Sequence, residues 1–436
     1  MFTRFTQSTI DVPQWSLHTW RPPADPDKLA CPYQAGFTAD ITSHIPPAPF
    51  GGRDYAPVTR LAVSDQALRS LKQTELVMAN PPLEPAAPIA GTSAAAATTR
   101  RNCTLLVTHP LAVVDGRGAQ LAVCTITPKD SEAPLGQVSG QPPGVPESFQ
   151  AVAKIYDPLY YSFASKISES VPCDVTWLAD QDYTREAAAY QHLQSVKQTG
   201  AFAPWYFGSW TFTVDIRIGN KMLTRPVRLI LIEYIQGPSI RELYSATRFD
   251  DAYRLEVLAR ILDGDAKLRL SGIYQRDLAA RNVLLEWDPD VPETAQPDTI
   301  PRVVLIDYNN SVVYARTTRW RGVCDGMTLP KNPMWFHWND GLQEFWGWIP
   351  AQWETNYRLR QEWLRERFGG KDTVASYAPV EDKLEYAASV PDQPVNSETA
   401  PAPTSTTEKA HWPIDFYAAA RRSDGVKGVE TGAAES

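Results

Sequence analysis

The order of β-rich and helical stretches is the feature that most restricts how this 436-residue chain can fold. Five stretches rich in β-branched and aromatic residues follow one another between residues 103 and 235, and one helical stretch interrupts them. The β-rich stretches are CTLLVTHPLAVV, AQLAVCTIT, FQAVAKIYD, WYFGSWTFTV and VRLILIEYI, and the helix is DYTREAAAYQHLQSV. After Gly237 the pattern becomes mostly helical, as in DDAYRLEVLARILDGDAKLRLSG. This order predicts an α+β protein with two lobes that meet near Glu233–Gly237.

Proline-rich sequence lies at both ends of the chain. The first hundred residues contain RPPADPDK, HIPPAPFGG and NPPLEPAAPIAGTSAAAATT, none of which has a period that could bury one face. Within them, VSDQALRSLKQTELVM favours a short helix capped by Ser64 or Asp65. We therefore expect a mostly irregular arm at 1–100, a β-rich unit at 101–237, a helical unit at 238–370 and a disordered tail at 371–436.

Composition and charge narrow the class of protein. The formal net charge is −8 and no basic patch is visible, so we expect no nucleic-acid partner. No apolar run is long enough to cross a membrane, and the first residues lack the pattern of a signal peptide. Five cysteines without CxxC spacing argue against a disulfide framework and against a zinc site. We expect an intracellular protein, in the cytoplasm or the nucleus, with no membrane partner.

Four polar motifs occur in a fixed order along the β-rich and helical stretches. They are Lys154 near the end of AVAKIY, Glu186 in the helix, RDLAARN with Asp277 and Asn282, and Asp307 after VVLI. Together they resemble the motifs of the eukaryotic protein-kinase superfamily over about residues 103–345, and most closely those of divergent kinase-like proteins of filamentous fungi. The segment RDLAARN matches the tyrosine-kinase form of the catalytic loop.

The resemblance implies a bilobal protein-kinase-like fold, with a small β-rich N-lobe that carries one helix and a shortened helical C-lobe. It also implies ATP and Mg²⁺ as cofactors, because phosphoryl transfer depends on positioning and on neutralising phosphate charge. Lys154 would contact the α- and β-phosphates and Glu186 would hold that lysine in an ion pair. Asn282 and Asp307 would bind Mg²⁺, which prefers oxygen ligands. Asp277 would orient the acceptor hydroxyl and take its proton.

Further residues follow from the same resemblance. The backbone of Glu233 and Ile235 would bind the adenine, and Gly116 and Gly118 in DGRGAQLAV would cover the phosphates. Arg281, four residues after Asp277, matches the tyrosine-kinase loop and is a further candidate catalytic residue. For each motif there is a plainer alternative: a solvated strand-edge lysine, a helix-surface glutamate, a capped surface turn and a tight hairpin turn.

Several departures from the family pattern leave the activity open. In the family, a glycine-rich lid covers the phosphates; its third glycine is replaced here by Leu121. The histidine that usually precedes the Arg-Asp pair is replaced by Gln275, and the metal-binding triplet reads Asp307-Tyr308-Asn309. No Ala-Pro-Glu follows; a tryptophan-rich segment, LPKNPMWFHWNDGLQEFWGWIPAQW, stands there instead. The first hypothesis is a phosphotransferase whose acceptor is a protein hydroxyl or a small molecule, as in aminoglycoside and choline kinases. The alternatives are a pseudokinase scaffold that binds a nucleotide or a partner, and an interaction module that binds no nucleotide.

Overall fold

The computed structural model describes residues 20–57, 63–86, 100–129, 148–165, 171–243, 249–287, 299–339, 342–380 and 384–386. Its main β-structure is a closed six-stranded antiparallel barrel in the order β1-β2-β3-β4-β6-β5. The strands are β1 (Thr38–Ser43), β2 (Asn102–Ala112), β3 (Gln120–Pro128), β4 (Phe149–Tyr156), β5 (Tyr206–Ile218) and β6 (Lys221–Ile232). The five β-rich stretches of the sequence correspond to β2 to β6, whereas β1 was not predicted.

Strand β1 closes the barrel from within the proline-rich arm. Its residue Thr38 pairs with Leu106 of β2, and Thr42 pairs with Thr211 of β5. Without β1, strands β2 and β5 would leave open sheet edges, and closure removes both. The six residues of β1, TADITS, show only one fully buried position, so the sequence carried little signal for it.

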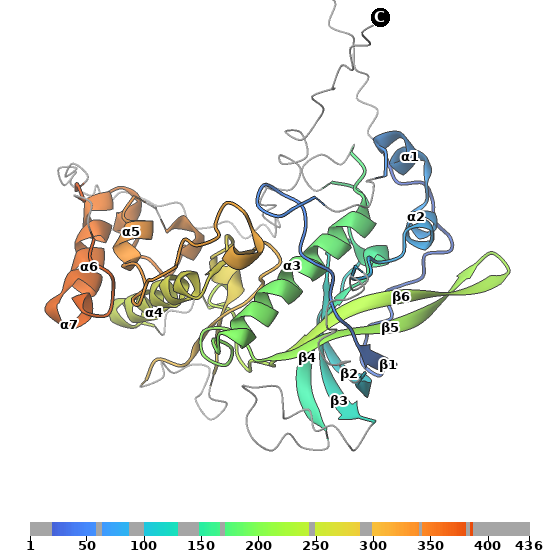
Figure 1. Cartoon of the computed structure of the whole chain (residues 1–436), viewed down its shortest axis with the longest axis horizontal. Coiled ribbons are helices and arrows are strands. Elements are labelled where there is room, and N and C mark those ends of the chain that lie inside the picture. Colours follow the sequence, from blue (N-terminus) through green and yellow to red (C-terminus); the bar gives the residue numbers. More distant parts are fainter. Residues whose placement is uncertain are drawn as a thin grey trace, which may run out of the picture.

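The helices lie against the barrel and at one end of the molecule (Figure 1). Figure 1 shows α3 running along the barrel, whereas α4 to α7 gather away from β1 to β3. The helices are α1 (Asp65–Ser70), α2 (Gln73–Ala79), α3 (Val175–Ser195), α4 (Asp251–Leu270), α5 (Pro333–His337), α6 (Tyr357–Gly369) and α7 (Lys371–Val374). Single turns of 3₁₀ helix occur at Pro158–Tyr160, Ala280–Asn282, Tyr314–Arg316, Gln343–Phe345 and Ala351–Glu354.

The apolar core is continuous between the barrel and the helices. One buried cluster includes Val152 of β4, Tyr190 of α3, Leu262 of α4 and Leu364 of α6. A second cluster fills the interior of the barrel and extends to α1 and α2. The bilobal protein-kinase-like fold predicted from the sequence is therefore wrong: a closed barrel replaces the small N-lobe, and the first cluster joins strands of this barrel to the helices.

The segment Glu233–Gly237, where the sequence suggested that two lobes meet, is tightly packed. A Cβ atom at Gly237 would lie 1.9 Å from the carbonyl oxygen of Leu285 in β8 (Val283–Leu285), so only glycine fits there. The amide of Trp287 donates to Gln236 O at 2.7 Å, and that of Leu285 donates to Pro238 O at 3.1 Å. Strand β8 thus fastens the segment that the sequence suggested as a joint between lobes.

Two short strand pairs hold the loops beside the barrel. Strand β8 pairs with β9 (Val303–Leu305), and β7 (Ile273–Tyr274) pairs with β10 (Val312–Val313). The stretch RVVLIDYNNSVV therefore contains two short strands with Asp307 in the turn between them. These pairings bring residues near 277 and residues near 307 to the same place.

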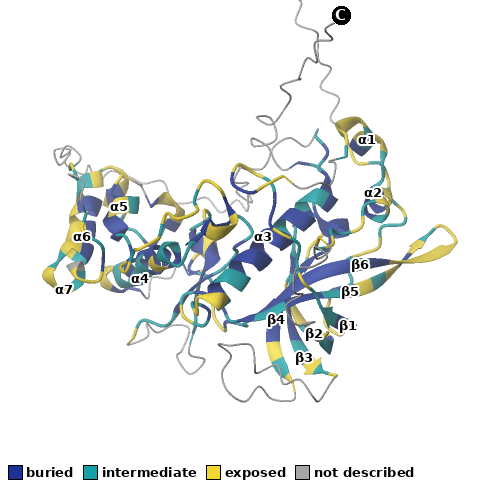
Figure 2. Ribbon diagram, viewed as in Figure 1, coloured by how far each residue is buried: buried dark blue, intermediate teal, exposed yellow. Residues whose placement is uncertain are grey.

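Helix α3 is buried along most of its length, as Figure 2 shows. Asp174 caps its N-terminus by accepting from the Trp177 amide at 3.0 Å, and the run Ala187–Ala189 is buried. The helix predicted at Ser64 is present, with Ser64 accepting from Ala67 N, but it is divided into α1 and α2. Burial on several sides explains how polar residues in the middle of α3 are removed from water.

The two ends of the chain are described only in part. Most of the predicted tail lies outside the described residues, and within it the structure places α7 and residues 375–380 and 384–386. Residues 1–19, 58–62 and 87–99 of the predicted arm also lie outside them. None of the helices that the structure describes is both long enough and apolar enough to cross a lipid bilayer.

Candidate functional site

Three charged residues that are distant in sequence meet beside β4. The Nζ atom of Lys154 lies 2.5 Å from Glu186 Oε2 on α3 and 2.5 Å from Asp307 Oδ1. Lys154 is 8% exposed and Glu186 is fully buried. This burial excludes the two plainer interpretations, in which Lys154 is a solvated residue at a strand edge and Glu186 lies on a helix surface. The side chain of Asp307 is 33% exposed, so the cluster opens to solvent on the side of this carboxylate.

Burial and charge act in opposite directions on this cluster. Burial alone would lower the pKa of Lys154, but the charges of Asp307 and Glu186 raise it above its ordinary value. Burial would raise the pKa of Asp307, yet Lys154 holds it below its ordinary value. For Glu186 burial prevails, and its pKa is raised despite the neighbouring lysine. Lys154 therefore stays protonated, and of the two carboxylates Asp307 is the better stabilised as an anion.

Further contacts fix the two carboxylates. Glu186 Oε2 accepts from the hydroxyl of Tyr156 at 2.7 Å, and Oε1 accepts from the amide of Tyr308 at 3.3 Å. The backbone of Asp307 has φ = 65°, a left-handed conformation that is costly for a residue other than glycine. Such strain at a charged residue beside a buried ion pair indicates a site at which position is tightly constrained.

The loop RDLAARN lies next to this cluster. Asn282 Nδ2 donates at 2.9 Å to both the carbonyl oxygen and the Oδ2 atom of Asp277. Arg281 forms an ion pair with the other oxygen of Asp277, and its Nη1 atom is 3.3 Å from Glu344. The amide of Ile306 donates to Asn282 O at 2.9 Å, which ties the loop to the residue before Asp307. The structure thus brings together Asp277, Arg281, Asn282 and Asp307.

The turn between β2 and β3 contains both candidate lid glycines. Gly116 and Gly118 have φ values of 76° and 119°, as a tight hairpin turn requires. The Gly116 amide donates to Tyr160 O at 3.0 Å, and Gln120 Nε2 donates to Gly118 O at 2.8 Å. Backbone and side-chain contacts therefore hold this turn in one conformation.

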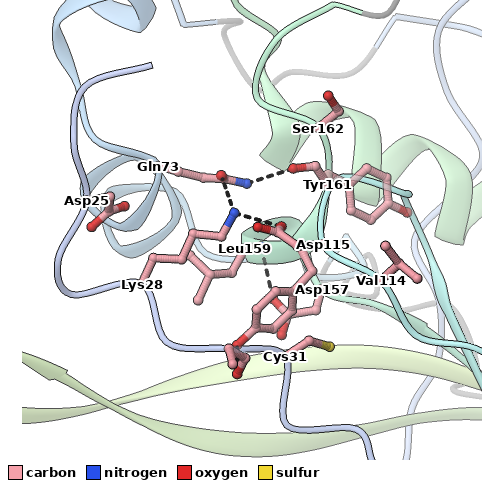
Figure 3. A network of polar contacts seen from close by, with 12 residues as sticks. Asp25, Lys28, Cys31, Gln73, Val114, Asp115, Asp157, Leu159, Tyr161 and Ser162 are labelled. Carbon is pink, nitrogen blue, oxygen red and sulfur yellow. Dashed lines mark hydrogen bonds and ion pairs between the residues drawn. The ribbon is translucent and has the colours of Figure 1, made fainter. Parts of the chain in front are cut away.

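The N-terminal segment also contacts this turn, as Figure 3 shows. Lys28 Nζ lies 2.7 Å from Asp115 Oδ1 and donates to Gln73 Oε1 at 3.0 Å. Gln73 donates in turn to Tyr161 O at 2.9 Å. Residues of the arm, of α2 and of the segment after β4 thus form one polar network around the turn.

Sequence reasoning missed two residues beside the cluster. Arg117, between the two glycines, is exposed and interacts electrostatically with Asp307 and Tyr161. Asp182 lies four residues before Glu186, hence on the same face of α3, and accepts from the Tyr161 hydroxyl at 3.2 Å. Burial raises the pKa of Asp182 to about 7, against the opposing effect of Lys154. The four-residue spacing was the available signal for Asp182; nothing in the sequence singled out Arg117.

The proposed adenine contacts are only partly compatible with the structure. The amide of Glu233 donates to Trp205 O at 2.9 Å, so this amide is already used. The side chain of Glu233 binds Arg302 at 2.8 and 2.9 Å and accepts from the Trp205 amide. Ile235 is buried. The carbonyl of Glu233 and the backbone of Ile235 remain the predicted contacts of a base.

Two of the oxygen-bearing residues at the site, Asn282 and Asp307, are the ones predicted to bind magnesium. Among the described residues, no group of three histidine, cysteine, aspartate or glutamate side chains is arranged to hold a metal. Magnesium does not need such a group, because it is commonly bound by one or two protein carboxylates together with substrate phosphates and water. The amide nitrogen of Asn282 donates to Asp277, so a metal ligand on this residue would have to be its Oδ1 atom. These donors fit magnesium held jointly with phosphate.

Neither protein-family models nor curated protein sequences match the chain. A hollow of about 390 Å³ between α6 and α7, lined by residues such as Trp363, Arg367 and Asp372, contains none of the residues described above. The assignment of function therefore depends on the geometry of the site.

Proposed function

We propose that this protein is a phosphotransferase that uses ATP and Mg²⁺. The observation that carries the proposal is the buried Lys154 with two carboxylate partners, adjacent to a loop with an aspartate and an asparagine. A buried lysine with a raised pKa provides a permanent positive charge, which phosphate oxygens require. The motif order that resembles the protein-kinase superfamily supports the same chemistry.

Each residue of the cluster has a role in this reaction. Lys154 neutralises phosphate oxygens and exchanges its contact with Asp307 for one with the nucleotide, while Glu186 keeps it in place. Arg117, on the neighbouring turn, contributes a second positive charge to the phosphates. When bound, Mg²⁺ would neutralise further phosphate charge, held by Asn282 and Asp307.

Asp277 acts on the acceptor. It accepts the proton of the acceptor hydroxyl while that oxygen forms a bond to the γ-phosphorus and the bond from this phosphorus to the β–γ bridging oxygen breaks. The products are ADP and a phosphorylated acceptor, and the proton passes from Asp277 to solvent. Both a protein hydroxyl and a small-molecule alcohol meet this chemistry.

One observation favours a second candidate, a nucleotide-binding scaffold without turnover. Asp277 is already engaged by Arg281 through one carboxylate oxygen and by Asn282 through the other, so both oxygens have partners before an acceptor hydroxyl approaches. In this alternative the same cluster binds nucleotide and stabilises the fold. Binding and turnover must therefore be measured separately.

The test compares Asp277→Asn and Asp307→Asn with the wild type. We expect Mg²⁺-dependent thermal stabilisation by ATP in the wild type and in Asp277→Asn, and its loss in Asp307→Asn, because a ligand that binds the native state raises its stability. Turnover of ATP should fall by about 10²-fold or more in Asp277→Asn. Asp215→Asn, an exposed aspartate on β5, is the matched control and should behave as the wild type.

Each outcome separates the candidates. Stabilisation by ATP with equally low turnover in the wild type and in Asp277→Asn supports the scaffold. An absence of stabilisation at millimolar ATP with Mg²⁺ contradicts both candidates.

A further inference from the structure

A short segment of the proline-rich arm, Phe50–Tyr55 (FGGRDY), is buried against the candidate site. Phe50 is 2% exposed, and Asp54 and Tyr55 are each 6% exposed. We call these six residues the brace segment. Its contacts lie on α3, on the loop that contains Asp277 and on the chain after Asp307. Its role in catalysis rests on the proposed function.

Asp54 contacts the catalytic loop directly. Its Oδ2 atom accepts from the guanidinium of Arg276, and its Oδ1 atom accepts from Trp320 Nε1 at 2.7 Å. The partners lie 222 and 266 residues further along the chain. Both carboxylate oxygens of a nearly buried aspartate are therefore used to join the arm to the site.

Arg276, the residue that Asp54 holds, has a strained backbone. Its φ is 64°, and it directly precedes Asp277. A left-handed conformation at a residue other than glycine persists only where its surroundings impose it. On one side Gln275 Nε2 donates to Ile306 O at 2.6 Å, and on the other Asp54 binds the guanidinium. The position of the Asp277 carboxylate thus depends on a backbone that Asp54 helps to hold.

The rest of the brace segment fixes the elements around this contact. The hydroxyl of Tyr55 donates to Ser311 O at 3.0 Å and accepts from the amide of Val313 at 2.7 Å, so it secures the chain after Asp307. Arg185 Nε donates to Phe50 O at 3.0 Å, next to Glu186 on α3. The brace segment therefore contacts the residue before Glu186, the residue before Asp277 and the chain shortly after Asp307.

We propose that Asp54 is a positioning residue, which orients Asp277 through Arg276, and that the brace segment assembles the site from within the same chain. Asp54 itself contacts neither the Lys154 cluster nor Asp277, so its effect is on the geometry of the loop. This predicts that losing the Asp54 carboxylate loosens residues 274–283 and lowers kcat, while ATP binding at Lys154 and Asp307 is retained.

The experiment uses Asp54→Asn in the full chain, with hydrogen exchange of the peptide 274–283 as its first measurement. We expect exchange to be at least about tenfold faster than in the wild type. We also expect kcat to fall at least about tenfold, with KM for ATP and Mg²⁺–ATP thermal stabilisation unchanged. Arg53→Ala, an exposed residue of the same segment, is the matched control and should change none of these quantities.

A second variant tests whether Asp54 acts through Arg276. Arg276→Gln removes the same contact from the other side, and the side chain of Arg276 is 35% exposed, so this variant also serves if Asp54→Asn does not fold. The double variant should lose no more activity than either single variant, because both remove one interaction. Additive losses would overturn the proposal.

Two further outcomes are decisive. Unchanged exchange of residues 274–283 in both single variants overturns the proposal, as does a loss of ATP stabilisation that matches the loss of kcat. If exchange rises as expected but the wild type turns over no ATP, the positioning role of Asp54 stands and the proposed function fails.

Discussion

Two buried charge clusters lie near the end of β4, around residues that are three positions apart in the sequence. They differ in how completely each charged group is paired with a group of opposite charge. Lys154 belongs to the first and Asp157 to the second. Asp157 is fully buried and binds both terminal nitrogens of Arg225 at 2.6 Å, and it also accepts from the Tyr33 hydroxyl at 2.5 Å and the Leu159 amide at 3.0 Å. The carboxylate has a partner on each oxygen, and the pair is closed to solvent.

The Lys154 cluster is less well satisfied. It is partly open at Asp307, burial raises the pKa of Glu186, and burial raises the pKa of Asp182 to about 7. An excess of carboxylate around one lysine leaves negative charge without a partner in the absence of a ligand, whereas the Asp157 carboxylate has a cation bound to both of its oxygens. Such perturbed groups gather at functional sites, so the comparison supports a structural role for Asp157 and the catalytic role that we propose for Lys154.

The largest effect on stability is expected from Arg225→Met. The substitution leaves the Asp157 carboxylate buried without its cation, which typically costs about 3–5 kcal/mol. We expect this loss in the free energy of unfolding measured in urea. Arg217→Met, an exposed arginine on β5, is the control and should change stability by less than about 0.5 kcal/mol. A loss below about 1 kcal/mol in Arg225→Met would contradict a structural role for the Asp157 pair.

Lys154→Met is expected to separate activity from stability. Under the proposed function, removing one preorganised positive charge should lower phosphoryl transfer by about 10²–10³-fold, equivalent to about 3–4 kcal/mol in the transition state. Its effect on unfolding should be smaller than that of Arg225→Met, because Glu186, whose pKa is already raised, can take up a proton. Turnover and urea unfolding of both variants would check this. A Lys154→Met protein that is as unstable as Arg225→Met would remove the distinction between the clusters.

The sequence predicted more of the site than of the fold. The spacing of Asp277 and Asn282 is local, and so are the positions of Lys154 and Asp307 near the ends of apolar strands. The pairing of β8 with β9 brings Asn282 close to Asp307. The approach of Lys154 to Asp307 depends instead on how the barrel packs against these strands. The barrel depends on β1, whose six residues have no clear period and pair with strands about 65 and 170 residues away. The role of Asp54 could not be predicted either, because a single aspartate between an arginine and a tyrosine has no local pattern. The contacts of β1 and Asp54 join the N-terminal arm to residues far along the chain, so no local sequence pattern could predict them.

Asp182 gives the smallest and most specific test of the comparison. Its ordinary pKa of 3.8 is raised to about 7 in the folded protein by burial, which Lys154 only partly offsets. Between about pH 4 and pH 7 the folded state holds a proton that the unfolded state has lost, so this group makes the protein less stable as pH rises. Above pH 7 the carboxylate is charged in both states, and its full cost is present.

Asp182→Asn should therefore stabilise the protein at pH 8 and not at pH 4. Three pKa units represent roughly 4 kcal/mol, and because Asp182 is half-buried we expect a gain of about 1–2 kcal/mol at pH 8. The asparagine still accepts the bond from Tyr161, so the packing is preserved. Urea unfolding of both proteins at pH 4, 6 and 8 measures the difference, with Asp215→Asn as the exposed control. If the difference in unfolding free energy between the wild type and Asp182→Asn did not change with pH, the excess of carboxylates around Lys154 would not destabilise the folded state. The contrast with the Asp157 pair would then disappear.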